Sequence, residues 1–246
     1  MMRRVVVYPD AATVATATAA RLLTELTDIL AHQDRADVVV TGGTVGIATL
    51  RAVADNPVAQ AVDWTAVHLW WGDERFVAAG DPDRNEGQAQ EALIERIPIP
   101  AQNVHRMGSA TEYSTVETAA AAYHDDLAHN GNPQFDVLML GVGPDGHVAS
   151  LFPEHPALDV SGVATVGVHG SPKPPPLRVS LTFDAIRAAR EVWIVAAGAE
   201  KASAVASALS SAPVTTTPAA GALGTAATRW LIDAAASEHL PRPDQG

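Results

Sequence analysis

Short apolar runs rich in β-branched residues alternate with stretches of helical spacing, and this alternation restricts the fold more than any other feature of the chain. Five runs typical of buried strands are Val5–Tyr8, Val38–Thr41, Val67–Trp71, Val137–Leu140 and Val192–Ala196. Apolar residues with helical spacing lie between the runs, as at Leu22, Leu23, Leu26, Ile29 and Leu30. Strands that alternate with helices predict an α/β fold, with a mostly parallel sheet and helices on both faces.

The length and composition fit one folded unit with a sizeable core. The chain has 246 residues, of which 47% are hydrophobic and 18% are charged, which is a globular profile. We therefore expect a single α/β domain over residues 1–246, with at most a small appended lobe. The absence of cysteine excludes disulfides, thiol nucleophiles and iron–sulfur clusters, so the chemistry must come from histidines, carboxylates, hydroxyls and cations.

The charge balance and the apolar segments argue against two classes of partner. With 16 Lys and Arg against 28 Asp and Glu, the formal net charge is −12, whereas nucleic-acid binders carry a basic face. The apolar stretch Val5–Tyr8 is too short for a signal peptide. The longest uncharged run, Ala202–Thr228, contains Pro213 and Pro218 and lacks the apolar density of a membrane span. We expect a cytoplasmic protein that binds neither nucleic acid nor membrane.

Polar or glycine-rich turns follow four of the predicted strands. They are TGGTVGIATL after the second run, GDERFV after the third, GVGPDGHVASLFPEHP after the fourth and AGAEKASAV after the fifth. Parallel α/β sheets bind their ligands outside the carboxyl ends of the strands. We therefore expect these four turns to meet in one crevice.

The turn after the second run has the features of a phosphate-binding loop. Gly42 and Gly43 let backbone N–H groups approach an anion, and a helical stretch with a partly positive N-terminus begins near Thr44. An ordinary strand-to-helix turn with Thr44 as N-cap explains the same residues, so both interpretations stay open. Residues 141–146 formally match the dinucleotide pattern G-x-G-x-x-G, but Pro144 interrupts them, and we predict no nucleotide cofactor.

Asp145 and His147 flank a glycine directly after the fourth run. A histidine at the ligand edge of a sheet can act as a general base, because its unperturbed pKa of about 6.5 lies near working pH. The alternative is a loop histidine that only accepts or donates a hydrogen bond to Asp145. His155 lies nearby, but no third ligand appears at a recognisable metal-binding spacing, so we predict no metal site.

Charged residues accumulate in the predicted crevice loops. Asp73 can bind hydroxyls and Arg75 can bind phosphate, while the spacing of Asn85 favours a helix N-cap over a ligand. Further cations in these loops are Lys173, Arg178 and Lys201. Each of them taken singly fits an ordinary surface charge. Because cations are scarce in this acidic chain, their concentration in these turns predicts a local anion site.

Taken together, these segments resemble the 6-phosphogluconolactonase family, the lactone-opening enzymes of the oxidative pentose phosphate pathway. The resemblance covers nearly the whole chain, in order, through TGGT, WWGDERFV, DPDRNEGQAQEAL, LMLGVGPDGHVASLFPEHPAL, PKPPPLRVSLTF and VAAGAEKASAV. The fourth of these segments, LMLGVGPDGHVASLFPEHPAL, is the most specific for the family. The resemblance implies a Rossmann-like sheet with a smaller appended lobe, similar to the fold of the hexosamine-6-phosphate isomerases and deaminases.

The resemblance also implies roles for individual residues. His147 matches the base that activates water, and Asp145 lies beside it in the D-G-H element. The phosphate-side positions of the family match Gly42, Gly43, Thr44, Arg75, Arg178 and Lys201, and we add Asp73 and Asn85 to the predicted binding residues. The chain departs from the family at Arg84, where serine is common, and at Val45–Gly46, where Thr-Pro is common. The roles of Arg84 and Lys173 stay open.

The implied reaction is hydrolysis of 6-phospho-D-glucono-1,5-lactone to 6-phosphogluconate, without a cofactor, by a monomer or weak homodimer. One rival is a sugar-phosphate isomerase or deaminase on the same scaffold. Those enzymes usually follow the histidine with an F-N-E-P type segment, whereas this chain has ASLFP there. A second rival is a non-catalytic sugar-phosphate sensor with an added helix-turn-helix module. The first predicted strand begins at Val5, which leaves no room for one before it.

Overall fold

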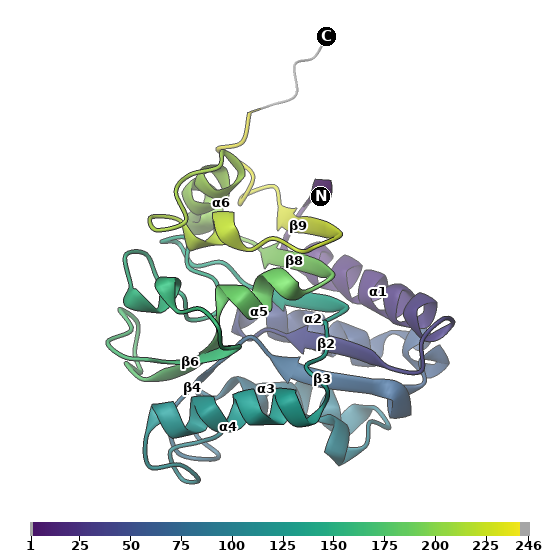
Figure 1. The fold of residues 1–246 in the computed structure, drawn as a ribbon. Coiled ribbons are helices and arrows are strands. Elements are labelled where there is room, and N and C mark those ends of the chain that lie inside the picture. Colours follow the sequence, from purple (N-terminus) through teal and green to yellow (C-terminus); the bar gives the residue numbers. More distant parts are fainter. Residues whose placement is uncertain (1, 242–246) are drawn as a thin grey trace.

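The computed structural model describes residues 2–241, and its largest element is a six-stranded sheet (Figure 1). The strands are β1 (Met2–Tyr8), β2 (Ala36–Val40), β3 (Val67–Trp71), β5 (Val137–Leu140), β8 (Glu191–Ala196) and β9 (Ala227–Asp233). Their order is β1-β9-β8-β5-β2-β3, and every neighbouring pair is parallel. The predicted α/β fold with a mostly parallel sheet is confirmed.

Helices cover both faces of this sheet. They are α1 (Ala11–Leu30), α2 (Gly43–Asp55), α3 (Asn85–Ala92), α4 (Val116–His129), α5 (Phe183–Ala188) and α6 (Ala202–Leu209). In Figure 1, α1 and α2 lie behind the sheet and α5 lies in front of it. α1 begins after the N-cap Asp10, whose carboxylate accepts the N–H of Thr13 at 2.7 Å. It buries the apolar stripe that includes Leu22 and Leu26.

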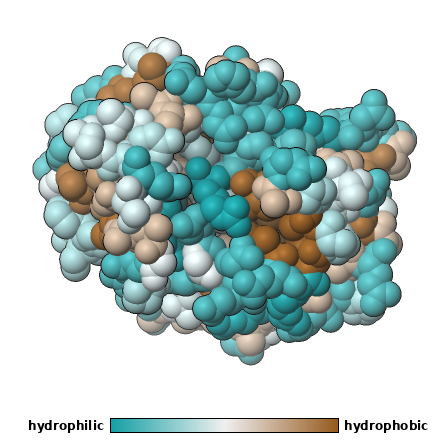
Figure 2. All heavy atoms as spheres, turned by 90° about the horizontal axis from the view of Figure 1, so that it is seen from below, coloured by the Kyte–Doolittle hydropathy of each residue, from teal (hydrophilic) through white to brown (hydrophobic). Residues whose placement is uncertain are grey.

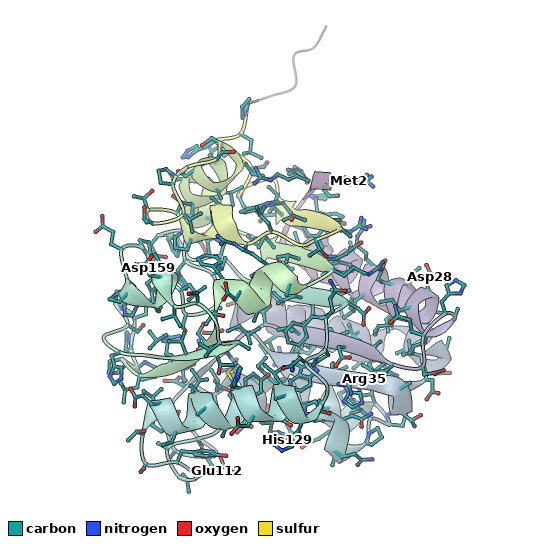
Figure 3. The ribbon with its side chains drawn as sticks, in the orientation of Figure 1. Met2, Asp28, Arg35, Glu112, His129 and Asp159 are labelled. Carbon is teal, nitrogen blue, oxygen red and sulfur yellow. The ribbon has the colours of Figure 1, made fainter. Side chains whose placement is uncertain are left out.

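α4 divides its side chains between the core and the solvent. Tyr123 is buried, and its hydroxyl accepts the backbone N–H of Trp71 at 2.8 Å. His129 in the last turn is exposed (Figure 3). The face of the molecule seen from below is hydrophilic over most of its area, with a smaller apolar area (Figure 2). Within residues 2–241, none of the helices combines the length and the apolar character that crossing a bilayer requires.

A second, three-stranded antiparallel sheet carries two of the predicted arginines. Its strands are β4 (Asp73–Arg75), β6 (Thr165–Val168) and β7 (Arg178–Leu181), in the order β4-β7-β6. Leu181 donates its backbone N–H to the carbonyl of Gly72 at 2.9 Å, which joins this sheet to the end of β3. This three-stranded sheet is the smaller of the two sheets and lies beside the large parallel sheet.

The four strands that lead into the glycine-rich and charged turns are neighbours, in the order β8-β5-β2-β3. The chain leaves β2 toward β3 on one side and later leaves β5 toward β8 on the other, so the connections diverge at the β2–β5 boundary. Such a boundary is where open α/β sheets bind ligands. Thr41 Oγ1 bridges it by accepting the N–H of Gly141 at 3.2 Å.

Two sequence predictions about strands are wrong. β1 is not buried, because among the described strands it lies at the edge of the sheet next to β9, and Val5 and Val7 are 39% and 49% exposed. The apolar runs do not predict β9, because Arg229 interrupts it. In the fold, the guanidinium of Arg229 pairs with the carboxylate of Glu191 at 2.8 Å, which lets a charged residue lie within an interior strand.

The structure corrects the predicted cap at Asn85 and the alternative interpretation that placed a cap at Thr44. α2 begins at Gly43 with Gly42 as its N-cap, so Thr44 lies inside the helix. Gly43, the first helical residue, has a φ of +79°, a conformation that favours glycine, so the helix begins before Thr44. Asn85 is the first helical residue of α3 rather than its cap, and Arg84 occupies the cap position.

Candidate active site at the carboxyl edge of the sheet

The turns after β2, β3, β5 and β8 border a cavity of about 180 Å³ at the carboxyl edge of the parallel sheet. It is lined by Thr41, Gly42, Gly43, Asp73, Arg75, Asn85, Gly141, Val142, Gly143, His147, Ala149, Lys173, Arg178 and Lys201. This lining includes eight of the ten predicted site residues. Of the other two, Thr44 lines an adjoining cavity, and Asp145 is hydrogen-bonded to His147.

His147 and Asp145 form a hydrogen-bonded pair beside this cavity, with 2.6 Å between Nδ1 and Oδ1. Partial burial of Asp145 opposes its ionisation, but the hydrogen bond and charge of His147 outweigh this effect and lower the pKa of Asp145 to about 2. Asp145 is therefore ionised at neutral pH and can only accept in this bond. Nδ1 of neutral His147 must carry the proton, which leaves Nε2 with the lone pair that can accept one.

Close packing fixes the orientation of His147. Gly143 donates its N–H to the carbonyl of His147 at 2.9 Å. A Cβ atom at position 143 would lie 2.0 Å from His147 Nδ1 and 2.3 Å from Asp145 Oδ1, so only glycine leaves room for the pair. Phe152 adds a ring contact, with its centroid 4.6 Å from that of the imidazole. Gly143 thus makes room for the histidine pair, which is a different role from the one that this glycine has in the dinucleotide pattern.

Two arginines meet across the small sheet. Arg75 of β4 and Arg178 of β7 are direct partners in the strand register, and like charges placed opposite each other destabilise a sheet. Burial lowers the pKa of Arg178, while the carboxylate of Asp73, 3.8 Å away, opposes that shift. A bound anion would offset the repulsion between the two guanidinium groups. Their pairing therefore supports an anion site at this wall of the cavity.

Arg178 also holds the proline-rich loop that precedes it. Nε donates to the carbonyl of Pro175 at 3.3 Å, and Nη2 donates to the carbonyls of Lys173 and Pro174, each at 3.2 Å. Much of the donor capacity of this guanidinium is therefore engaged by backbone. The loop brings Lys173 to the cavity, where its Nζ lies 3.9 Å from Asp145 Oδ1.

Glu74 is a structural residue of the site that the sequence motifs did not indicate. Its buried carboxylate accepts the backbone N–H groups of Arg75 at 2.7 Å, Asn85 at 2.8 Å and Glu86 at 2.9 Å. Burial raises its pKa to about 6, although these hydrogen bonds oppose the shift. Glu74 thus joins β4 to the start of α3. The one available signal was strand alternation, because the middle residue of D-E-R must point away from its two neighbours.

Asn85 connects Arg75 with the glycine loop. Its Oδ1 accepts a hydrogen bond from Arg75 Nη1, and its Nδ2 donates to the carbonyl of Asp73 at 2.9 Å. A Cβ atom at Gly42 would lie 1.8 Å from Asn85 Oδ1, so this close approach requires glycine. The guanidinium of Arg75 is therefore held next to the glycine loop.

The glycine loop and Lys201 line a second cavity of about 160 Å³, which shares Gly42, Gly43 and Lys201 with the first. Thr44 lines this second cavity at the start of α2. Within the described residues, no side chain caps that helix end, so its first N–H groups can bind an anion. Burial and the charge of Lys173 lower the pKa of Lys201. These features make the second cavity a candidate phosphate site.

Asp73 faces the first cavity and is held there by a buried serine. Ser150 Oγ donates to Asp73 Oδ2 at 2.7 Å, and Ser150 itself has no exposed surface. Ser150 therefore acts on the site through Asp73. Within residues 2–241, no group of three or more histidine or acidic side chains is arranged to hold a metal ion.

Arg84 lies outside the cavity and has a structural role. Its side chain is 1% exposed, and it donates to Glu86 Oε1 at 2.8 Å, to the carbonyl of Arg75 at 3.1 Å and to that of Met107 at 2.7 Å. These hydrogen-bond partners offset the cost of burying the guanidinium charge, which has no contact with the cavity. Arg84, where the chain departs from the resembled pattern, lines neither of the two cavities described above.

Comparisons with known proteins agree over most of the chain. A family model described as "Glucosamine-6-phosphate isomerases/6-phosphogluconolactonase" matches residues 9–230. A Streptomyces coelicolor relative named 6-phosphogluconolactonase is 53% identical over 97% of this chain and 95% of its own length. A Mycobacterium leprae relative of the same name is 43% identical over 98% of this chain and 100% of its own. The solved structure of a Trypanosoma brucei 6-phosphogluconolactonase has a TM-score of 0.84 at 27% identity, covering 97% of this chain and 99% of that one.

Proposed function

The chain belongs to the family of glucosamine-6-phosphate isomerases and 6-phosphogluconolactonases, and on this premise we propose how its residues carry out the lactonase reaction. The chain is a lactone-hydrolysing enzyme that converts 6-phospho-D-glucono-1,5-lactone to 6-phosphogluconate. The assignment of roles to residues below rests on the geometry of the two adjoining cavities.

His147 is the general base in this proposal. The observation that carries it is the hydrogen bond of 2.6 Å to Asp145 beside a cavity lined by four cations. The bond keeps the proton on Nδ1, so Nε2 can remove a proton from a water molecule. The water oxygen then bonds to C1 of the lactone, and the bond from C1 to the ring oxygen breaks. The ring oxygen takes the proton from His147, and the new acid ionises to a carboxylate.

The phosphate group is anchored at the glycine loop. The N-terminus of α2 and Lys201 line the second cavity, and the guanidinium of Arg75 is held beside the glycine loop by Asn85. Arg178 supports the anion site through its charge and through the loop that it holds. Asp73 offers a carboxylate to the sugar hydroxyls. Binding of the phosphate at one end holds the lactone carbonyl near the base at the other end, and this fixed orientation raises the rate of the reaction.

The rival isomerase or deaminase reaction lacks a residue in this site. Those reactions would use a glutamate shortly after the histidine, and the corresponding segment here is Ala149–Pro153. The cavity residue from this segment is Ala149. Incubation with glucosamine 6-phosphate should therefore release no ammonia, whereas ammonia at an enzymatic rate would favour the rival.

The function is tested by following acid release with a pH indicator. The purified chain should accelerate opening of the phosphorylated lactone above the enzyme-free rate, and kcat/KM should be far lower for unphosphorylated glucono-1,5-lactone. His147→Ala should lower kcat by about 10² to 10⁴, while the matched variant His155→Ala should retain it, because His155 does not line the cavity. Full turnover by folded His147→Ala would refute the role of the histidine.

We also propose that the enzyme acts in the cytoplasm as a monomer or weak homodimer, with residues 1–246 forming one functional domain and no cofactor. The globular composition of the chain supports the single folded domain. Light scattering of the purified chain over a range of concentrations tests the oligomeric state, and limited proteolysis tests the single domain.

A further inference from the structure

We propose that Lys173 is a further catalytic residue, whose ammonium group stabilises the negative charge that develops on the carbonyl oxygen of the lactone. The proposal rests on the proposed function of His147 as the base. It names a group that interacts with the carbonyl oxygen, whereas the sequence motifs and the resemblance assigned no residue to that role.

Lys173 is the cavity cation that pairs with the loop bearing His147. Its Nζ lies 3.9 Å from Asp145 Oδ1, the same oxygen that accepts the hydrogen bond of His147. The attacking water must lie next to His147 and next to C1 of the lactone. The carbonyl oxygen is bonded to C1, so a cation beside the base is placed to meet the charge that forms there.

The other three cations are committed to different parts of the site. Arg75 is held against the glycine loop through Asn85, and Lys201 lines the adjoining cavity with that loop. Arg178 donates to three carbonyls of the proline-rich loop. Lys173 lines the first cavity and not the second. Lys201 lines both cavities, so Lys173 is the lysine that lines the first cavity alone.

The backbone of Lys173 is fixed while its ammonium stays available. The Lys173 carbonyl accepts from Arg178 Nη2 at 3.2 Å and from Ser171 Oγ at 2.8 Å. The side chain is 43% exposed, and the distance of 3.9 Å to Asp145 is longer than a hydrogen bond. Among the described residues, the ammonium group has no hydrogen-bond acceptor, so its three N–H groups are available to substrate.

The use of lysine in this chain is restricted to the site. The sequence contains two lysines, Lys173 and Lys201, against 14 arginines among its 16 basic residues. Both lysines line the first cavity. An ammonium is a compact point charge with rotatable donors, whereas guanidinium is a planar fork. A compact donor suits a single oxygen whose position changes as C1 becomes tetrahedral.

The step that Lys173 assists is balanced by groups already described. His147 Nε2 takes a proton from water while the water oxygen bonds to C1 and the carbonyl π electrons move onto the exocyclic oxygen. The ammonium of Lys173 donates a hydrogen bond to that oxygen and keeps its proton. Collapse of the intermediate restores the carbonyl and breaks the bond from C1 to the ring oxygen, which takes the proton from His147.

The test compares Lys173→Met with Lys201→Met, which remove the same charge at the two ends of the site. The probe is glucitol 6-phosphate, which has the phosphate and hydroxyls but no carbonyl or carboxylate. Lys173→Met should lower kcat by about 10² to 10³ and leave the Kd of glucitol 6-phosphate unchanged. Lys201→Met should instead raise that Kd. Lys173→Arg, which keeps the charge, should recover part of the lost kcat, and circular dichroism checks that each variant is folded.

Three results would overturn the proposal. One is a wild-type kcat in folded Lys173→Met. Another is a raised Kd for glucitol 6-phosphate with an unchanged kcat, which would make Lys173 a phosphate ligand. The third is a loss of kcat that disappears when Asp145→Asn is already present, because Lys173 would then act only by positioning Asp145. Failure of the wild-type enzyme to open the lactone is a separate result, measured first, and it would refute the proposed function itself.

Discussion

Replacing Gly143 with alanine should disturb the hydrogen-bonded pair of His147 and Asp145 while both of these residues are kept. The added Cβ would lie 2.0 Å from His147 Nδ1, 2.1 Å from its Cε1 and 2.3 Å from Asp145 Oδ1. Ordinary contact with a Cβ begins at about 3.4 Å. The imidazole must therefore move by about 1.4 Å, the difference between 2.0 and 3.4 Å, or the loop must deform by a comparable amount.

This displacement sets the size of the expected effect. A misplacement of about 1 Å can cost about 10² in rate, because the reacting atoms leave their near-attack geometry. Complete loss of a general base costs about 10² to 10⁴. We therefore expect kcat of Gly143→Ala to fall by at least about 10², with a change in KM below about threefold, because the glycine loop and Lys201 are untouched. Overpacking should lower the free energy of unfolding by about 1 to 3 kcal/mol.

The assay is steady-state lactone opening with a pH indicator, combined with thermal unfolding to confirm that the variant is folded. Gly87→Ala is the matched control, since a Cβ there would meet nothing within 4 Å and alanine favours the helical backbone of α3. The control should keep wild-type kcat. If folded Gly143→Ala also kept it, the steric reasoning about the histidine pair would be wrong.

Four further predictions concern residues around the same site. Asp145→Asn should lower kcat by at least about 10² at unchanged KM, because an amide can donate as well as accept and no longer keeps the proton on Nδ1 of His147. A wild-type kcat in steady-state kinetics would contradict this prediction. Arg75→Ala should raise KM for the phosphorylated lactone by about tenfold or more, as expected for a lost charged hydrogen bond, and an unchanged KM would remove Arg75 from the phosphate site. The pKa of Glu74 is raised from 4.5 to about 6, so the stability that its protonated form contributes is complete below pH 4.5 and is lost as the pH rises through about 6. In urea unfolding, the wild type should therefore lose stability relative to Glu74→Gln over this range of pH. A stability difference that does not change with pH would refute the assignment. Arg84→Met should lower the free energy of unfolding by about 3 kcal/mol, because it strips a buried network of its donor, and a loss below about 1 kcal/mol by urea titration would show that Arg84 is not a structural support.

The lactonase reaction could be predicted because the motifs that carry the family resemblance are contiguous in the sequence. Asp145 and His147 are two positions apart, and Gly42 is followed directly by Gly43, so each motif is complete within one turn. Hydrophobic period and turn chemistry act over the same short range. These two local signals were sufficient to predict that strands alternate with helices and that polar turns follow the strands.

The residues that support the site could not be predicted in the same way. Glu74 and Arg84 sit inside charged motifs and differ little from solvated residues in the sequence, but the fold buries both and surrounds them with backbone partners. Arg178 matched a phosphate-binding position, and the structure engages much of its guanidinium with carbonyls of its own loop. β9 was missed because the partner of Arg229 is Glu191, on a neighbouring strand.

By itself, the sequence determined the α/β fold class and indicated a candidate base and a candidate anion site, because the patterns that encode them are local. Only the tertiary structure decided which cations come together around the cavity. Arg75 meets Arg178 through the register of β4 and β7, and Lys173 reaches Asp145 through a loop held by Arg178. Register and strand order depend on burying the correct faces over the whole chain at once, so no short segment can specify them.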